Sequence, residues 1–153
     1  MRRVLALTTA VVMAALVLSG CSKPYPGVSV WAGTRSLHEP AQCWSYNANQ
    51  GVDLAACAQA LSILDKAGQI PTLTVTPGGT MGISVDVAVA KQGWVAHLGT
   101  NTLTPTTMSS TYWRFTYPQL TSLAKKNQLV IFANGPAKNS YRGVWVYNTI
   151  EKQ

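Results

Sequence analysis

Short strand-like segments separated by turn residues constrain the fold of this chain more than any other feature. Residues 28–32 are β-branched and aromatic, and residues 72–76 and 81–89 alternate between apolar and other side chains. Such alternation places every second side chain on one face of a strand. A Pro-Gly-Gly-Thr cluster at residues 77–80 indicates a turn between the two alternating segments. The pattern predicts a mainly β protein.

Residues 81–89 are expected to form one strand, because Ile83, Val85, Val87 and Val89 fall on one face. Further strands are expected in five other segments, at residues 41–46, 93–98, 111–116, 128–133 and 141–150. The last two flank a turn-rich segment, which is typical of a hairpin with a long tip.

Two segments break this β pattern. Asp53 precedes an apolar stripe at helical spacing, which consists of Leu54, Cys57, Leu61 and Leu64. Gly68 and Pro71 follow as stop signals, so a capped helix is predicted, with an irregular crossover between strands as the alternative. A shorter helix is expected to begin at Pro118 and to end with two lysines.

About seven strands with turns between them predict an antiparallel β-sandwich with one or two short helices. The chain has 153 residues, of which residues 28–153 are assigned to this domain. That length fits one domain with its own core.

The start of the chain is expected to be a targeting signal. Arg2 and Arg3 precede an uncharged run at residues 4–18, which is shorter than the ~20 residues that a membrane-spanning helix needs. Residues 18–21, Leu-Ser-Gly-Cys, resemble the lipobox of bacterial lipoproteins. The resemblance implies that the chain is cleaved before Cys21 and that the Cys21 thiol is acylated. An ordinary signal peptide with a chance cysteine is the alternative.

The lipobox resemblance divides the chain into a cleaved signal peptide at residues 1–20, a lipidated cysteine with a tether at residues 21–27, and the domain. It also implies a location on the extracytoplasmic face of the cell membrane, where the lipid on Cys21 is the anchor. The membrane is thus an expected partner.

Cys43 and Cys57 are expected to form a disulfide, because two cysteines in an oxidising compartment most simply pair. If the helix after Asp53 forms, the bond ties that helix to the sheet. A metal site that includes His38 lacks the spaced second pair of ligands that such sites use. We expect no metal and no cofactor.

Three segments carry a resemblance to a known family: residues 73–85, the Gly-Trp-Val at residues 93–95, and the Gly-Val-Trp-Val at residues 143–146. With them the chain resembles actinobacterial lipoproteins that hold a single Ig-like domain of unknown function. The resemblance implies an Ig-like β-sandwich in which Trp94 packs inside, and it implies no activity. The expected helix at residues 54–67 departs from a plain Ig pattern.

Positive charge is concentrated near the C-terminus. Residues 21–110 carry as many acidic as basic side chains, whereas residues 111–153 carry six Lys and Arg against Glu151 alone. In a secreted protein this favours anionic headgroups or wall polymers over nucleic acid as partners. A solvated basic face without a partner is the alternative. Four cations near the terminal hairpin are expected to tilt the domain on the membrane: Lys125, Lys126, Lys138 and Arg142.

No catalytic site is predicted. His38 and His97 are the possible general bases, and neither stands in a recognisable nucleophile motif. The five acidic residues have no distinctive setting, and no glycine-rich phosphate loop is present. We therefore expect a protein that is not an enzyme.

Aromatic residues are the best candidates for binding. Alternation in residues 112–117 places three aromatic side chains on one face and Tyr112 with Arg114 on the other. In the last strand valines alternate with Trp145 and Tyr147, so both of its faces are apolar. These side chains either pack in the core or form a binding face.

Three functions follow from these features. The first is a non-catalytic accessory module that docks an envelope or membrane protein through its last strands. The second is a binder of wall polymer or anionic lipid headgroups through a basic C-terminal face. A hydrolase is the remote third.

Overall fold

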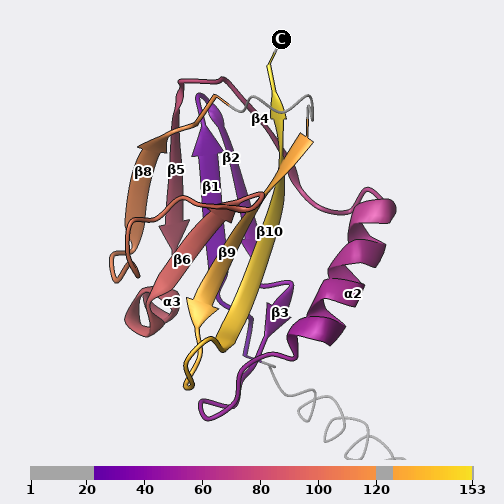
Figure 1. Ribbon diagram of the computed structural model, residues 1–153, viewed down its shortest axis with the longest axis vertical. Helices are drawn as coiled ribbons and strands as arrows, with labels where there is room; N and C mark the ends of the chain where they lie inside the picture. Colours follow the sequence, from indigo (N-terminus) through magenta and orange to yellow (C-terminus); the bar gives the residue numbers. More distant parts are fainter. Residues whose placement is uncertain (1–22, 120–125, 153) are drawn as a thin grey trace, which may run out of the picture.

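The computed structural model describes residues 23–119 and 126–152 of the chain. In these residues ten strands make two sheets that face each other, and two short helices lie at the margins (Figure 1). The predicted β-sandwich is therefore confirmed. The strands outnumber the expected seven because three of them are only two to four residues long. No helix in the described segments is long and apolar enough to cross a bilayer.

The first sheet has four antiparallel strands in the order β2-β1-β5-β8. These strands are β1 (Gly27–Ala32), β2 (Arg35–Pro40), β5 (Thr80–Val85) and β8 (Tyr112–Thr116). Gly33, in the turn between β1 and β2, has a φ of 58°, which glycine adopts without strain. At Gly82 a β-carbon would come within 2.2 Å of the Trp31 indole nitrogen, so the absence of a side chain lets Trp31 lie against β5.

The second sheet is built around its longest strand, β10. Its members are β3 (Cys43–Trp44), β4 (Thr72–Val75), β6 (Trp94–Leu98), β7 (Asn101–Thr102), β9 (Lys126–Asn134) and β10 (Tyr141–Glu151). Strand β9 borders β10 on one side, while β3 and β4 pair with its start and end, β4 in parallel. The ladder of β9 and β10 runs from Asn134 opposite Tyr141 to Lys126 opposite Ile150. The predicted terminal hairpin is confirmed.

The main core lies between the two sheets. Trp94, Trp145 and Tyr147 are fully buried there, so the expectation that Trp94 packs inside is correct. Their polar atoms are satisfied: the Trp94 indole donates to the Ser110 carbonyl at 2.9 Å, and the Tyr147 hydroxyl to the Val28 carbonyl at 2.6 Å. Burial raises the pKa of Tyr147, so its phenol stays neutral and remains a donor.

Helix α2 (Leu54–Lys66) confirms the predicted capped helix. The Asp53 carboxylate accepts the backbone N–H groups of Ala55 and Ala56 at 2.9 and 3.1 Å, which satisfies two donors at the helix start. The predicted disulfide is also present, because Cys57 on α2 is bonded to Cys43 on β3 with a Cα–Cα distance of 6.0 Å. The helix is thereby fixed against the outer face of the second sheet.

The strand expected at residues 81–89 ends at Val85, and this prediction is corrected. Helix α3 (Val87–Gln92) follows, so Val87 is 60% exposed while Val89 is buried. The Asp86 carboxylate accepts the Gly27 N–H at 2.7 Å, which fixes the chain at the point where the strand ends. Although the Val-Ala-Val-Ala run at residues 87–90 alternates in sequence, it is helical, and the Asp86 carbonyl accepts the N–H groups of Val89 and Ala90 at 2.9 and 3.0 Å.

Strand β2 was not expected, and the strand expected at residues 41–46 is reduced to β3. Strand β2 lies at the edge of its sheet with mostly exposed polar side chains, and only Leu37 packs against the core. Its strand character therefore depends on pairing with β1 and leaves little trace in its composition.

Several expectations fall at residues that lie outside the described segments. Cys21 and the leader are among them, as are Lys125 and most of the helix expected after Pro118. Lys126, expected at the end of that helix, instead begins β9.

Loss of the disulfide should destabilise the domain without changing its fold. Replacement of both Cys43 and Cys57 by Ser should lower the free energy of unfolding by about 3 kcal/mol. The two cysteines are 14 residues apart, and a disulfide that closes a loop of this length reduces the entropy of the unfolded chain by about that amount. Urea denaturation of the variant beside the oxidised and reduced native protein measures this. Free thiols on the native protein, detected by alkylation and mass spectrometry, would contradict the pairing.

Candidate functional site

An open groove of about 500 Å³ lies beside α2 on the outer face of the second sheet. Its floor comes from alternate residues of two neighbouring strands, Val130 and Phe132 on β9 with Val144 and Val146 on β10. The wall comes from one side of α2, where Leu54, Ala58, Leu61, Ser62 and Asp65 recur at helical spacing. We call this feature the α2–β9 groove.

Both ends of the helical wall are attached to the sheet. The disulfide holds Cys57 in the first half of α2. Near the other end, one oxygen of the Asp65 carboxylate accepts the Lys126 ammonium at 2.7 Å and the Asn148 side-chain amide at 3.1 Å. These two hydrogen bonds lower the pKa of Asp65, so its carboxylate stays charged well below neutral pH. The groove is therefore present in the free domain.

The surface of α2 is unusually apolar for an exposed helix. Asp65 and Lys66 are its charged residues, and they stand at its C-terminal end. Ile63 is 62% exposed and Leu54 is 42% exposed, while Cys57 is the residue of α2 that is buried, with 6% exposure. A helix that is hydrophobic all round is normally covered on all sides. The domain itself covers only one side of α2.

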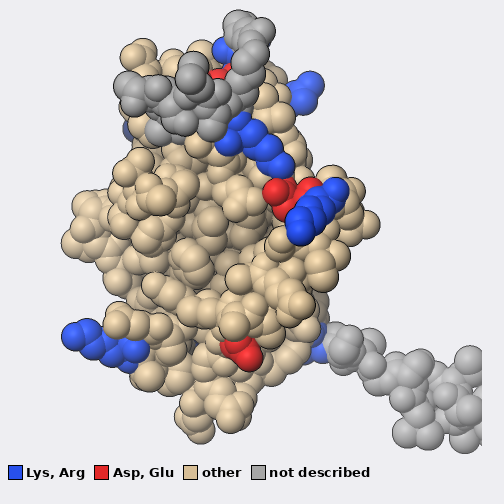
Figure 2. All heavy atoms as spheres, turned by 45° about the vertical axis from the view of Figure 1, so that its right-hand side comes forward, with Lys and Arg blue, Asp and Glu red and all other residues tan. Residues whose placement is uncertain are grey.

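Figure 2 shows this side of the molecule. Charged side chains gather at its margins, and a broad uncharged area with a hollow lies between them. Within this area the residues that line the groove are mostly apolar. An apolar area rimmed by polar groups is typical of an interaction surface. Phe132 and Tyr141, which both line the groove, have ring centroids 4.4 Å apart, and the aromatic surface continues past the groove to His97, 5.6 Å from Phe132.

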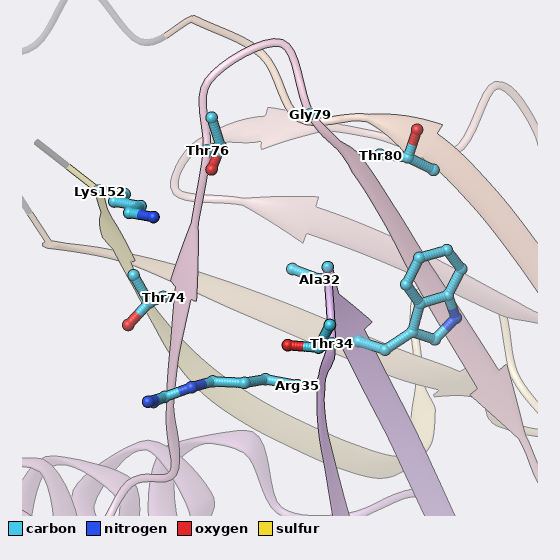
Figure 3. A pocket seen from close by; sticks show the side chains of 10 residues that line it. Ala32, Thr34, Arg35, Thr74, Thr76, Gly79, Thr80 and Lys152 are labelled. Carbon is cyan, nitrogen blue, oxygen red and sulfur yellow. The ribbon is translucent and has the colours of Figure 1, made fainter.

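A second hollow, of about 490 Å³, lies at the opposite end of the sandwich from the start of the described chain. Polar side chains line it: Thr34, Thr74, Thr76, Thr80, Arg35 and Lys152, with Trp31 at one side. Figure 3 shows Arg35 reaching from the start of β2 toward β4, which carries Thr74, with Thr76 just beyond its end. None of the described residues that line it is acidic. Hydroxyls, two cations and an indole suit an anionic, hydroxyl-rich ligand.

Trp145 and Tyr147 are not on the surface, and their interpretation as a binding face is corrected. Both side chains are buried in the core between the sheets, with 0% of their surface accessible to solvent. Val144 and Val146 on the other face of β10 are covered by α2 and its neighbours. Strand β10 is thus covered on both faces. Its sequence leaves open either core packing or a binding face, and core packing is what the structure has.

Tyr112 and Arg114 are exposed on the outer face of β8, on the face that the alternation predicts for them. Trp113 and Phe115 turn the other way and stack on each other against the core, with centroids 4.6 Å apart. Tyr112 and Arg114 lie on the first sheet, so they are separate from the α2–β9 groove.

Two of the four cations expected to tilt the domain on the membrane, Lys126 and Arg142, are far apart. Lys126 and Arg142 lie at opposite ends of the β9–β10 ladder, roughly 25 Å apart at the rise of a strand. Lys126 is paired with Asp65, whereas Arg142 donates to the Ser45 and Tyr46 carbonyls. Lys138 is exposed in the hairpin tip.

The histidines occupy unrelated places. His38 on β2 contacts the Ser29 hydroxyl at 2.9 Å, directly across the ladder from β1, and His97 lies on the second sheet. Among the described residues no three His, Cys, Asp or Glu side chains lie close enough to share a metal ion.

The groove residues of β9 were not predicted as site residues. A signal was present, because residues 129–133 are apolar without interruption and leave no polar face for solvent. The comparisons add no assignment: no family model, curated protein or solved structure matches the chain.

Proposed function

We propose that this protein is a lipid-anchored, extracytoplasmic binding module without catalytic activity, and that it docks an apolar segment of an envelope or membrane protein in the α2–β9 groove. The observation that carries the proposal is an apolar, exposed helix beside an open apolar groove. Docking there would cover the α2 residues that line the groove and are left exposed by the domain, Leu54 and Ala58 among them.

The shape of the groove favours a segment of protein chain as its occupant. The groove is open to solvent, so it does not enclose a small molecule, and its 13-residue wall is about 20 Å long. Apolar side chains at regular spacing along a partner segment fit such a groove. Gln128, Ser62 and Asp65 supply polar groups at one end, as expected for an interface with an apolar centre and a polar rim.

The membrane anchor is proposed from the sequence. The lipobox-like residues 18–21 and the resemblance to Ig-like actinobacterial lipoproteins both support acylation of Cys21 at the extracytoplasmic face. An anchored module meets a membrane partner at high local concentration, so a groove of modest intrinsic affinity is sufficient.

The anchor is tested by the Cys21→Ala substitution. This variant, expressed behind an ordinary cleavable signal peptide in place of residues 1–20, should leave the membrane fraction, because acyl chains hold a protein far more firmly than its modest net charge does. The measurement is the share of protein that stays with membranes after a high-salt wash. Retention of the variant, or an unmodified N-terminal peptide in the mass spectrum of the native protein, would contradict lipidation.

The groove is tested by a matched pair of arginine substitutions on α2. Ala58 lines the groove and Ile63 does not, although both side chains are exposed. Ala58→Arg should reduce recovery of a stoichiometric partner from detergent-solubilised membranes by more than about tenfold, because docking would bury an unpaired charge. Ile63→Arg should leave recovery unchanged. Equal recovery with both variants, measured by quantitative mass spectrometry, would exclude the groove as the docking site.

A second candidate function is binding of an anionic wall polymer in the hollow between Arg35 and Lys152. The observation that favours it is the lining of the hollow, which consists of threonine hydroxyls and two cations. None of the described residues in this lining carries a carboxylate. This lining corresponds to the basic-face alternative, with Lys152 as its C-terminal contribution.

The hollow is tested with a purified phosphate- or carboxylate-bearing wall glycan. Arg35→Gln combined with Lys152→Gln should weaken retention on the immobilised glycan about tenfold or more, since each charge-assisted hydrogen bond contributes ~1.5–3 kcal/mol. Lys66→Gln combined with Lys138→Gln removes the same charge outside the hollow and should have little effect. Equal losses in the two double variants would assign the retention to net charge alone.

A further inference from the structure

The end of the sandwich where the described chain begins carries a cluster of aromatic and cationic side chains. Its members are Lys23, Tyr25, Trp44, Tyr46, Lys91 and Arg142. Tyr25 and Tyr46 are 44% and 49% exposed, which is high for aromatic residues of a small domain. We call this surface the basal face.

Direct contacts fix the basal face. The Tyr25 and Tyr46 rings lie 5.3 Å apart, and the Tyr46 hydroxyl donates to the Lys23 carbonyl. The Arg142 guanidinium stands over the Trp44 ring at 5.3 Å and donates to the Ser45 carbonyl at 3.1 Å. These aromatic side chains are therefore held at the surface rather than free to fold inward.

The charge of the basal face is positive at its centre. A shallow hollow of about 290 Å³ lies between the tyrosine-bearing segments and α3. Lys23, Lys91 and Arg142 line it, and none of the described residues in its lining is acidic. Of the carboxylates near this end, Asp86 accepts the Gly27 N–H, Asp53 caps α2, and Glu39 lies opposite Val28 outside the hollow. Aromatic rings beside cations are the composition that proteins place at a membrane–water interface.

The chain also holds this face close to Cys21. Residues 23–26, expected to be part of a short stiff tether, contact the domain: the Pro26 carbonyl accepts the Ala41 N–H at 3.0 Å and the Trp145 indole N–H at 3.2 Å. Ser22 is then the one residue between Cys21 and the first residue that contacts the domain.

We propose that the basal face lies on the membrane and binds anionic lipid headgroups, with the strands standing away from the bilayer. This inference rests on the proposed anchor at Cys21. The α2–β9 groove then opens sideways along the membrane surface, toward neighbouring envelope proteins. The hollow at Arg35 and Lys152 points away from the membrane.

The first test uses the unanchored chain, Cys21→Ala behind a cleavable signal peptide, with vesicles of equal parts phosphatidylglycerol and phosphatidylcholine. Lys23→Gln combined with Lys91→Gln should weaken co-sedimentation at low salt about 30-fold, since each cation near an anionic surface contributes about fivefold.

Arg142 is kept because it supports the Ser45 and Tyr46 backbone. The matched control, Lys66→Gln with Arg114→Gln, removes the same charge outside the basal face and should change binding little. Equal weakening in both double variants, or no binding by the parent chain, overturns the proposal.

The second test uses the acylated protein reconstituted in the same vesicles, with bromine on the lipid acyl chains near the headgroups. Bromine should quench part of the tryptophan fluorescence, and Trp44→Phe should reduce that part, because Trp44 is the tryptophan that lines the basal hollow while its neighbour Trp145 is fully buried. Quenching that is unchanged by Trp44→Phe overturns the orientation. Loss of the anchor itself is read separately, as release of the native protein from membranes by high salt, so failure of the anchor and failure of the basal face give different results.

Discussion

Coverage of strand β10 on both faces is the constraint on which the rest of the structure depends. Its inward side chains, Trp145 and Tyr147, fill the space between the sheets. Its outward side chains, Val144 and Val146, need a second cover, and α2 supplies it. A strand that is apolar on both faces must be covered on both faces. The domain therefore has three layers, two sheets and a helix, whereas a plain β-sandwich has two layers.

The third layer is narrower than the sheet beneath it, and the candidate site follows from this difference. The disulfide and the Asp65 contacts hold α2 over β10 and the edge of β9. Val130 and Phe132 on β9 are apolar as well, but a single helix does not cover them completely. The uncovered part is the groove. The lack of charge along most of α2 extends the same apolar surface outward.

The two ends of the sandwich differ in chemistry, and this difference gives the molecule a direction. Exposed tyrosines and three cations gather where the described chain begins, and threonines with Arg35 and Lys152 gather at the opposite end. If the anchor is at Cys21, these ends face the bilayer and the wall respectively, and the groove lies between them. One small domain then has a separate surface for each neighbour.

The sequence by itself determined the features that depend on near neighbours: the cap at Asp53, the pairing of Cys43 with Cys57, the terminal hairpin, and the alternation that turns Tyr112 outward. Tertiary structure alone decided whether an apolar face is covered. It buried Trp145, left Phe132 partly open, and placed Lys126 far from Arg142. It also decided that β2 is a strand and that residues 87–92 are a helix. Periodicity predicts which side chains share a face. Whether that face is buried depends on segments far away in the sequence, and their positions are set by the packing of the whole domain.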